Sequence, residues 1–181
     1  CSALSAFYWN RNSWLGQMGS YPQIILVDGP SGSGKTTLAL NLQKEFNCEV
    51  IHLDSIYNGW DDALGKTLTN RLIALVENFL RGEEYELPIF DWHKNRYEST
   101  HIVKPAQALI IEGVGAGQSA IRDKASKLYW VEASPEHALT RVLERDGYEI
   151  KEHMLRFKVS EAKHFEVERT REFADFIITT S

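Results

Sequence analysis

The chain has 181 residues, of which 43% are hydrophobic and 25% are charged, and its formal net charge is −5. This length suits a single domain with a sizeable core. The acidic balance argues against broad duplex DNA or RNA binding, which requires a basic face. The apolar runs fall short of the ~20 residues that a membrane-spanning helix needs, so we expect no membrane association.

The first recognisable elements surround a glycine-rich loop. Residues 4–18 are rich in aromatic side chains and predict a short helix, so that residues 1–22 form an N-terminal helical extension. The apolar run 24–28 then predicts a buried strand, and residues 35–46 predict a helix. Between them, residues 29–36 read Gly-Pro-Ser-Gly-Ser-Gly-Lys-Thr, which fits the phosphate-binding pattern G-x-x-x-x-G-K-[ST] in its usual place between a strand and a helix.

Each part of this loop has a physical role in binding a nucleoside triphosphate. The glycines let the backbone curl until successive amide groups point at phosphate oxygens. The following helix directs its positive N-terminal end at the same anion. Lys35 supplies a positive charge for the β- and γ-phosphates, and the hydroxyl group of Thr36 can bind Mg²⁺. We therefore expect the nucleotide to be held by Gly29, Ser31, Gly32, Ser33, Gly34, Lys35, Thr36 and Thr37.

Strand and helix patterns alternate along the rest of the chain. Apolar runs and helical periodicity predict strands at 49–53, 108–111, 128–131 and 175–179, and helices at 67–80, 117–126, 135–146 and 149–173. Residues 87–92 and 100–103 look like short extended pieces outside the main sheet. Apolar strands that alternate with helices are typical of a parallel sheet covered on both faces. We therefore predict one α/β domain over residues 1–181.

Acidic residues lie where predicted strands meet loops, and ligands of parallel α/β sheets bind beyond the carboxyl ends of the strands. Asp54 is placed to orient an acceptor hydroxyl and to take its proton. Glu112 is placed to bind Mg²⁺, which prefers water and one or two carboxylates. A turn or helix cap is the alternative role for Asp54, and a solvated turn for Glu112. For Asp28, before the loop, we expect a structural role with hydrogen bonds to nearby backbone.

These motifs resemble those of the uridine kinase-like members of the nucleoside and nucleotide kinases, over most of residues 23 to 179. Besides the loop, the resemblance rests on Asp54-Ser-Ile-Tyr57, Pro88-Ile-Phe-Asp91-Trp92, Ile110-Ile-Glu112-Gly113 and Arg141-Val-Leu-Glu-Arg145-Asp146. It implies a three-layer P-loop NTPase fold with five parallel strands in the order 2-3-1-4-5. It also implies a small mobile lid around residues 141–160.

The resemblance assigns roles to the acceptor side of the site. Asp54 would be the catalytic base, and Tyr57 would contact the nucleoside. Asp91 and Trp92 would contact the sugar and the base, and Glu112 is associated with the metal, beside Thr36.

The same resemblance assigns the arginines of the lid. Arg141 and Arg145 would clamp the transferring phosphoryl group, although a surface salt-bridge ladder is the alternative for two arginines spaced four apart on a helix. The chain departs from the family where Gly-Tyr-Glu-Ile at 147–150 replaces a further Arg-Gly of the lid. Extra basic residues within 91–96 are a second departure and would suit an acidic or phosphorylated substrate.

The sequence thus predicts an ATP- and Mg²⁺-dependent kinase that phosphorylates a hydroxyl group of a uridine-like nucleoside or a related metabolite. The alternatives are an NTP hydrolase and an ATP-binding regulatory module. The loose Asp-x-x-Gly at 62–65 precedes a helix instead of ending a strand, which disfavours a hydrolase switch. Cys1 and Cys48 form no C-x-x-C pair, and we find no secretory signal, so a cytoplasmic location is expected.

Overall fold

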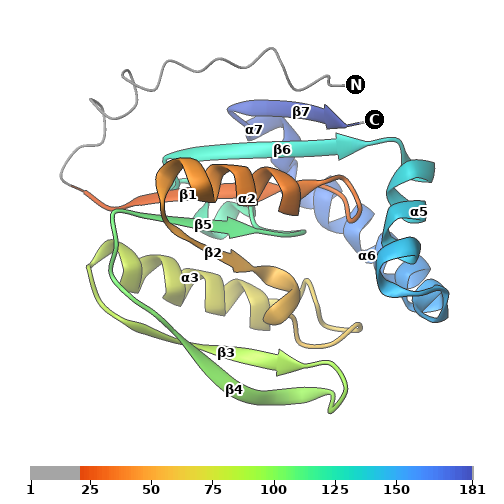
Figure 1. The fold of residues 1–181 in the computed structure, drawn as a ribbon, viewed down its shortest axis with the longest axis horizontal. Helices are drawn as coiled ribbons and strands as arrows, with labels where there is room; N and C mark the ends of the chain where they lie inside the picture. Colours follow the sequence, from red (N-terminus) through yellow and green to blue (C-terminus); the bar gives the residue numbers. More distant parts are fainter. Residues whose placement is uncertain (1–20, 181) are drawn as a thin grey trace.

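The strand that precedes the glycine-rich loop, β1 (Gln23–Asp28), is the central strand of the sheet. In the computed structural model, which describes residues 21–180, five parallel strands are arranged in the order β2-β5-β1-β6-β7 (Figure 1). The other four strands are β2 (Glu49–His52), β5 (Ala108–Glu112), β6 (Lys127–Ala133) and β7 (Phe176–Thr180). Counted within this sheet, the order is 2-3-1-4-5, so the predicted topology is confirmed. The helix expected at 4–18 lies outside the described residues.

The two faces of the sheet are covered by different helices, as alternation along β1 requires. Ile25 and Val27 pack with Ala39 of helix α2 (Lys35–Phe46). Ile24 and Leu26 belong to the larger core on the opposite face, which includes the buried residues of α3 (Lys66–Leu80). The remaining helices are α4 (Ser119–Arg122), α5 (Pro135–Asp146), α6 (Lys151–Glu168) and α7 (Thr170–Phe173), with 3-10 turns at Leu53–Ser55 and Tyr148–Ile150. The three-layer prediction is therefore confirmed.

Two predicted helices were wrong in extent. The helix expected at 117–126 is reduced to α4, because the backbone before it turns around Asp28 and donates the Gly117 amide to that carboxylate. The helix expected at 149–173 is interrupted at Arg169, whose φ of 51° is left-handed and ends α6. Helical periodicity does not reveal a break made by a single residue.

The extended pieces outside the main sheet pair with each other as an antiparallel hairpin. Strand β3 (Tyr85–Asp91) runs against β4 (Arg96–Val103), with a register shift between Ile89 and Phe90. Both strands are longer than predicted, and β4 is mostly exposed. The hairpin lies beside α3 (Figure 1) and brings Trp92, just after β3, to the turn that follows β2.

Asp28 has the structural role that was predicted for it. Its carboxylate is completely buried and accepts hydrogen bonds from the backbone amides of Gly29 (2.7 Å), Gly115 (3.0 Å) and Gly117 (2.8 Å). These bonds hold the loop after β5 against the start of the phosphate-binding loop. Burial is the dominant influence and raises the pKa of Asp28 to about 6, although the amides and Lys35 act in the opposite direction.

This raised pKa predicts the pH dependence of stability. Between about pH 4 and pH 6 the folded chain holds a proton on Asp28 that the unfolded chain has lost, so the free energy of unfolding falls as the pH rises. A shift from 3.8 to about 6 corresponds to about 3 kcal/mol. Urea titrations should therefore show the wild type losing about this much stability relative to Asp28→Asn, whose amide does not titrate, as the pH rises over that range. A stability relative to Asp28→Asn that stays constant, or that increases with pH, would contradict the assignment.

Candidate active site

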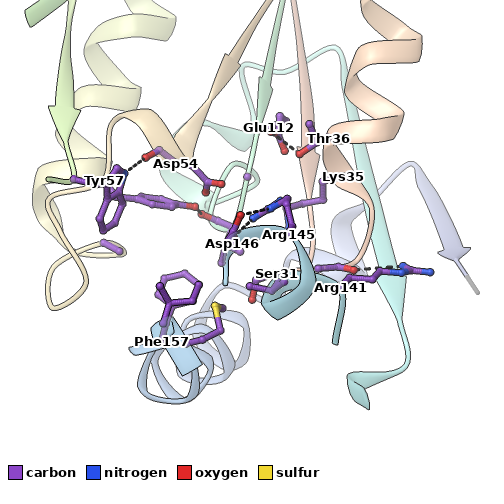
Figure 2. A pocket seen from close by; sticks show the side chains of 18 of the residues that line it. Ser31, Lys35, Thr36, Asp54, Tyr57, Glu112, Arg141, Arg145, Asp146 and Phe157 are labelled. Atoms are coloured by element: carbon purple, nitrogen blue, oxygen red, sulfur yellow. Dashed lines mark hydrogen bonds and ion pairs between the residues drawn. The ribbon is translucent and has the colours of Figure 1, made fainter. Parts of the chain in front are cut away.

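A cavity of about 860 Å³ opens at the carboxyl ends of β1, β2 and β5. Its walls come from the phosphate-binding loop, the segment after β2, the loop after β5, the tip of the hairpin, and helices α5 and α6. Figure 2 shows side chains from these separate segments around the same space. The volume lies within the range of ordinary ligand sites. This is the edge of the sheet at which the sequence predicted ligand binding.

The phosphate-binding loop is shaped for close backbone packing. At Gly29, where φ is 141°, an added Cβ would lie 2.0 Å from the carbonyl oxygen of Val131. At Gly32, where φ is 80°, an added Cβ would lie 2.0 Å from the carbonyl oxygen of Ala138. A larger residue at either position would force the loop away from β6 or α5. Gly34 caps α2 without a side-chain hydrogen bond, so the amides that begin this helix are available for an anion.

Lys35 is held inside the loop. Lys35 is only 7% exposed to solvent, and its Nζ donates a 2.8 Å hydrogen bond to the carbonyl oxygen of Pro30. Burial lowers the pKa of Lys35, while the carboxylates of Glu112, Asp28, Glu161 and Asp54 act in the opposite direction. An ammonium group among these acids is a strong electrostatic partner for phosphate oxygens.

Thr36 and Glu112, for which metal binding was predicted, are hydrogen-bonded to each other. The Thr36 hydroxyl donates to Oε1 of Glu112 at 3.1 Å, and Nδ1 of His52 lies 2.6 Å from the same oxygen. The Glu112 hydrogen bond raises the pKa of His52. Residues 21–180 contain no cluster of three His, Cys, Asp or Glu side chains suited to a metal ion. A hydroxyl with one carboxylate is nevertheless a donor set that fits Mg²⁺, which takes its other ligands from water and phosphates.

Asp54 faces the cavity from the 3-10 turn that follows β2. Burial raises its pKa, and the negative charge of Glu112 adds to the increase, while Lys35 and Arg145 oppose it. A raised pKa makes a carboxylate a better proton acceptor near neutral pH. The indole Nε1 of Trp92 donates to the backbone oxygen of Asp54 at 2.8 Å, which joins the hairpin to this turn.

The two arginines of α5 lie differently. Arg145 donates from Nε and Nη2 to both carboxylate oxygens of Asp146, at 2.6 Å each, and both residues line the cavity. Arg141 also lines the cavity, and it donates to the carbonyl oxygen of Gly32 and to the Thr180 hydroxyl, which fastens α5 to the loop and to β7. These contacts differ from the surface salt-bridge ladder that was the alternative for the two arginines.

The predicted substrate contacts are only partly brought together. Tyr57 and Trp92 line the cavity. Asp91 does not, because one oxygen of its carboxylate accepts from the backbone amides of His93 and Lys94 and closes the hairpin turn. Of the extra basic residues of this segment, Lys94 and Arg96 both form ion pairs with Glu98, whereas His93 lines the cavity.

Sequence reasoning missed the link between α6 and the phosphate-binding loop. The buried carboxylate of Glu161 accepts 2.7 Å hydrogen bonds from the backbone amide and the hydroxyl of Ser31. Lys158 donates to the Ser31 backbone oxygen and hydroxyl at 3.2 Å. Helix α6 is thereby fastened to the phosphate-binding loop. The available signal was spacing, because Glu161 follows Met154 and Phe157 on one buried helix face.

A known family and several relatives match most of this chain. The AAA domain family matches residues 25–166, which is most of the chain. A uridine kinase of Lactobacillus johnsonii is 30% identical over 149 residues, covering 71% of this chain and 69% of the relative. A uridine kinase of Clostridium perfringens is 28% identical over 180 residues, covering 87% of this chain and 86% of the relative.

Solved structures share the fold at lower identity. A possible uridine kinase from Bacillus stearothermophilus has a TM-score of 0.65 and 19% identity, covering 93% of this chain and 94% of the other. A shikimate kinase from Acinetobacter baumannii, in complex with shikimate, has a TM-score of 0.53 and 17% identity. The match covers 90% of this chain and 85% of the shikimate kinase. Within residues 21–180, no helix has the length and apolar character needed to cross a bilayer.

Proposed function

This chain is a phosphotransferase of the uridine kinase-like P-loop kinases and matches the AAA domain family, and we propose that it transfers the γ-phosphoryl group of ATP to a hydroxyl group of a nucleoside or a related small metabolite. The observation that carries the proposal is the meeting of Lys35 and Asp54 in one cavity. A phosphate-binding lysine needs no proton acceptor to hold nucleotide. A carboxylate that shares the cavity with this lysine supports transfer to an acceptor hydroxyl.

The proposed reaction follows from the placement of these groups. The acceptor oxygen forms a bond to the γ-phosphorus, the bond from that phosphorus to the bridging oxygen breaks, and ADP leaves with the electron pair. Asp54 orients the hydroxyl and accepts its proton. Lys35 and the amides at the start of α2 stabilise the negative charge on the phosphate oxygens. Arg145 lines the cavity from α5, where its guanidinium group is paired with Asp146. If that group bonded to the transferring phosphoryl group in place of Asp146, it would add a further positive charge there.

Mg²⁺ fits the same proposal. Thr36 and Glu112 would hold the ion together with phosphate oxygens and water, and His52 would fix the orientation of the Glu112 carboxylate. When bound, the ion would neutralise charge on the phosphates.

The hydrolase alternative receives less support from the residues that suggested it. The carboxylate of Asp62 accepts hydrogen bonds from Asn58 and Thr67, and the Gly65 amide bonds to the Asp62 carbonyl oxygen. These contacts build the turn before α3, away from the phosphate-binding loop. The regulatory-module alternative rests on the altered lid, which lacks the further arginine of the family at 147–150. Arg156 is the next arginine along the chain, but it lies exposed beside Glu152 and does not line the cavity.

A screen of ATP consumption tests the proposal. We expect nucleosides, or alcohols of similar size, to accelerate ADP formation well above the rate without acceptor, in reactions that contain MgCl₂. The panel includes nucleosides, nucleoside monophosphates, sugars and vitamin-like alcohols. If ADP forms at the same rate with every compound as with water alone, the chain is a hydrolase or a nucleotide-binding module.

A further inference from the structure

The peptide group between Pro30 and Ser31 is hydrogen-bonded on both of its sides. Its carbonyl oxygen accepts the 2.8 Å hydrogen bond from Nζ of Lys35, and its N–H donates a 2.7 Å hydrogen bond to Oε2 of Glu161 on α6. The peptide bond is trans, so its C=O and its N–H point in opposite directions. Lys35 and Glu161 therefore lie on opposite sides of one planar group, and both of them fix its orientation.

The carboxylate of Glu161 is fully provided with partners at this place. Glu161 is only 5% exposed, and its Oε2 also accepts a 2.7 Å hydrogen bond from the Ser31 hydroxyl. Lys158, one turn earlier on α6, places Nζ 3.4 Å from Oε1 and donates to the backbone oxygen and the hydroxyl of Ser31. A buried carboxylate is costly unless it is paired and hydrogen-bonded, and here it is both. Paired in this way, it adds no net charge beside a loop that binds phosphates.

Helix α6 is itself held firmly in the fold. Met154 and Phe157 lie on the same face as Glu161, are buried, and line the cavity. Glu161 does not line the cavity, whereas Ser31 does. The carboxylate therefore supports the phosphate-binding loop from the side that faces away from the ligand, and it acts on the site only through the loop.

The group that depends on this support is the ammonium group of Lys35. An ammonium group has three donors, and the position of the Pro30 carbonyl oxygen, which takes one of them, sets where the other two point. Burial lowers the pKa of Lys35, and the negative charge of Glu161 is among those that act in the opposite direction. A cation that faces phosphates loses much of its effect when it is displaced or left free to move.

We infer that Glu161 is a positioning residue of the nucleotide site: it fixes the Pro30–Ser31 peptide group and, through it, the ammonium group of Lys35. This inference rests on the proposed function and deepens it. Lys158 holds the Glu161 carboxylate in place and balances its charge. Without the carboxylate, the peptide group is free to turn, and Lys35 loses a fixed acceptor for its first hydrogen bond.

Calorimetric titration with ATP and MgCl₂ tests the role of the carboxylate. In Glu161→Ala the dissociation constant of ATP should rise about tenfold. In Glu161→Gln it should stay within about threefold of the wild type, because the amide oxygen can still accept both hydrogen bonds from Ser31. ATP binding that is unchanged in Glu161→Ala, or weakened equally in Glu161→Gln, overturns the inference.

Glu166→Ala is the matched control for Glu161→Ala. Glu166 is exposed on the same helix and does not line the cavity, and the chemical change is identical. Its dissociation constant for ATP should stay within about twofold of the wild type, as for an ordinary surface substitution. A tenfold loss in this control as well would assign the effect to the charge of the helix and overturn the inference.

A double-mutant cycle with Lys35→Met separates positioning from a contribution to stability alone. Glu161→Ala should weaken ATP binding less than about twofold in the Lys35→Met background, because the group that it positions is then absent. An equal factor in both backgrounds would show a purely structural role and overturn the inference. If Glu161→Ala does not fold, Glu161→Asp replaces it in the cycle with the same expectation, since it keeps the charge but withdraws the carboxylate from Ser31 by one methylene group.

The cycle reports ATP binding, so its outcome does not depend on an acceptor. Coupling between Glu161 and Lys35 in a chain that phosphorylates none of the compounds in the screen refutes the kinase function and retains the positioning role. Phosphoryl transfer to an acceptor, with equal effects of Glu161→Ala in the two backgrounds, retains the kinase function and refutes the positioning role.

Discussion

Replacing Asp54 by Asn is expected to lower kcat for phosphoryl transfer by about 10²–10⁴-fold, because the amide cannot accept the proton of the acceptor hydroxyl. The size of the side chain is preserved, so the turn at Leu53–Ser55 should persist. Binding of ATP should change by less than about threefold, since it depends on the phosphate-binding loop. The measurement is a set of initial rates with saturating ATP and acceptor, beside an ATP titration followed by calorimetry.

Asp61→Asn is the matched control for this variant. Asp61 lies in the same connecting segment, is exposed and does not line the cavity, and the chemical change is identical. Its kcat should stay within about twofold of the wild type, as for an ordinary surface substitution. Equal rates for Asp54→Asn and the wild type, with every acceptor that is phosphorylated, would remove Asp54 from the reaction. A parallel loss of ATP binding would instead point to a structural role for this carboxylate.

Replacing Lys35 by Met should lower kcat by about 10²–10³-fold and weaken ATP binding as well. The methionine side chain keeps an unbranched apolar stem of similar length but carries no charge. Both the ground state and the transition state then lose the cation that faces the phosphates, so kcat and the dissociation constant of ATP should change together. Initial rates and an ATP titration measure the two effects separately.

The control for Lys35→Met is Lys44→Met, at the exposed end of the same helix. It changes the net charge equally and leaves the cavity intact, so activity should remain near that of the wild type. Thermal unfolding of both variants checks that the helix persists. If Lys35→Met binds ATP as tightly as the wild type and retains its rate, the loop does not hold the triphosphate through this lysine.

Local patterns predicted the donor half of the site because every part of it is adjacent in sequence. The glycines lie between one strand and one helix, and Lys35 and Thr36 begin that helix, so the local sequence alone is enough to recognise the loop. The order of the main sheet was also predictable from the family resemblance. Asp54 and Glu112 could be placed because both follow apolar strands, and ends of parallel strands meet at one edge of the sheet.

The acceptor half was less predictable, since its contacts join segments far apart in sequence. The segment around Asp91 resembles a sugar-binding motif, but the hairpin turn uses that carboxylate for its own amides. Glu161 looks like one acid on a charged helix until the fold places it against Ser31. Periodicity reports which face of an element is buried, whereas the identity of the partner depends on the tertiary arrangement.

The central claim is that the γ-phosphoryl group is transferred to a hydroxyl group of an acceptor and not to water. Phosphorus-31 NMR of a reaction containing ATP, MgCl₂, the chain and the acceptor that performs best in the screen tests it directly. The account predicts a new phosphomonoester resonance that grows in step with ADP and is absent from the Asp54→Asn reaction. Growth of inorganic phosphate alone, equal to the ADP formed and unaffected by the acceptor, would contradict it.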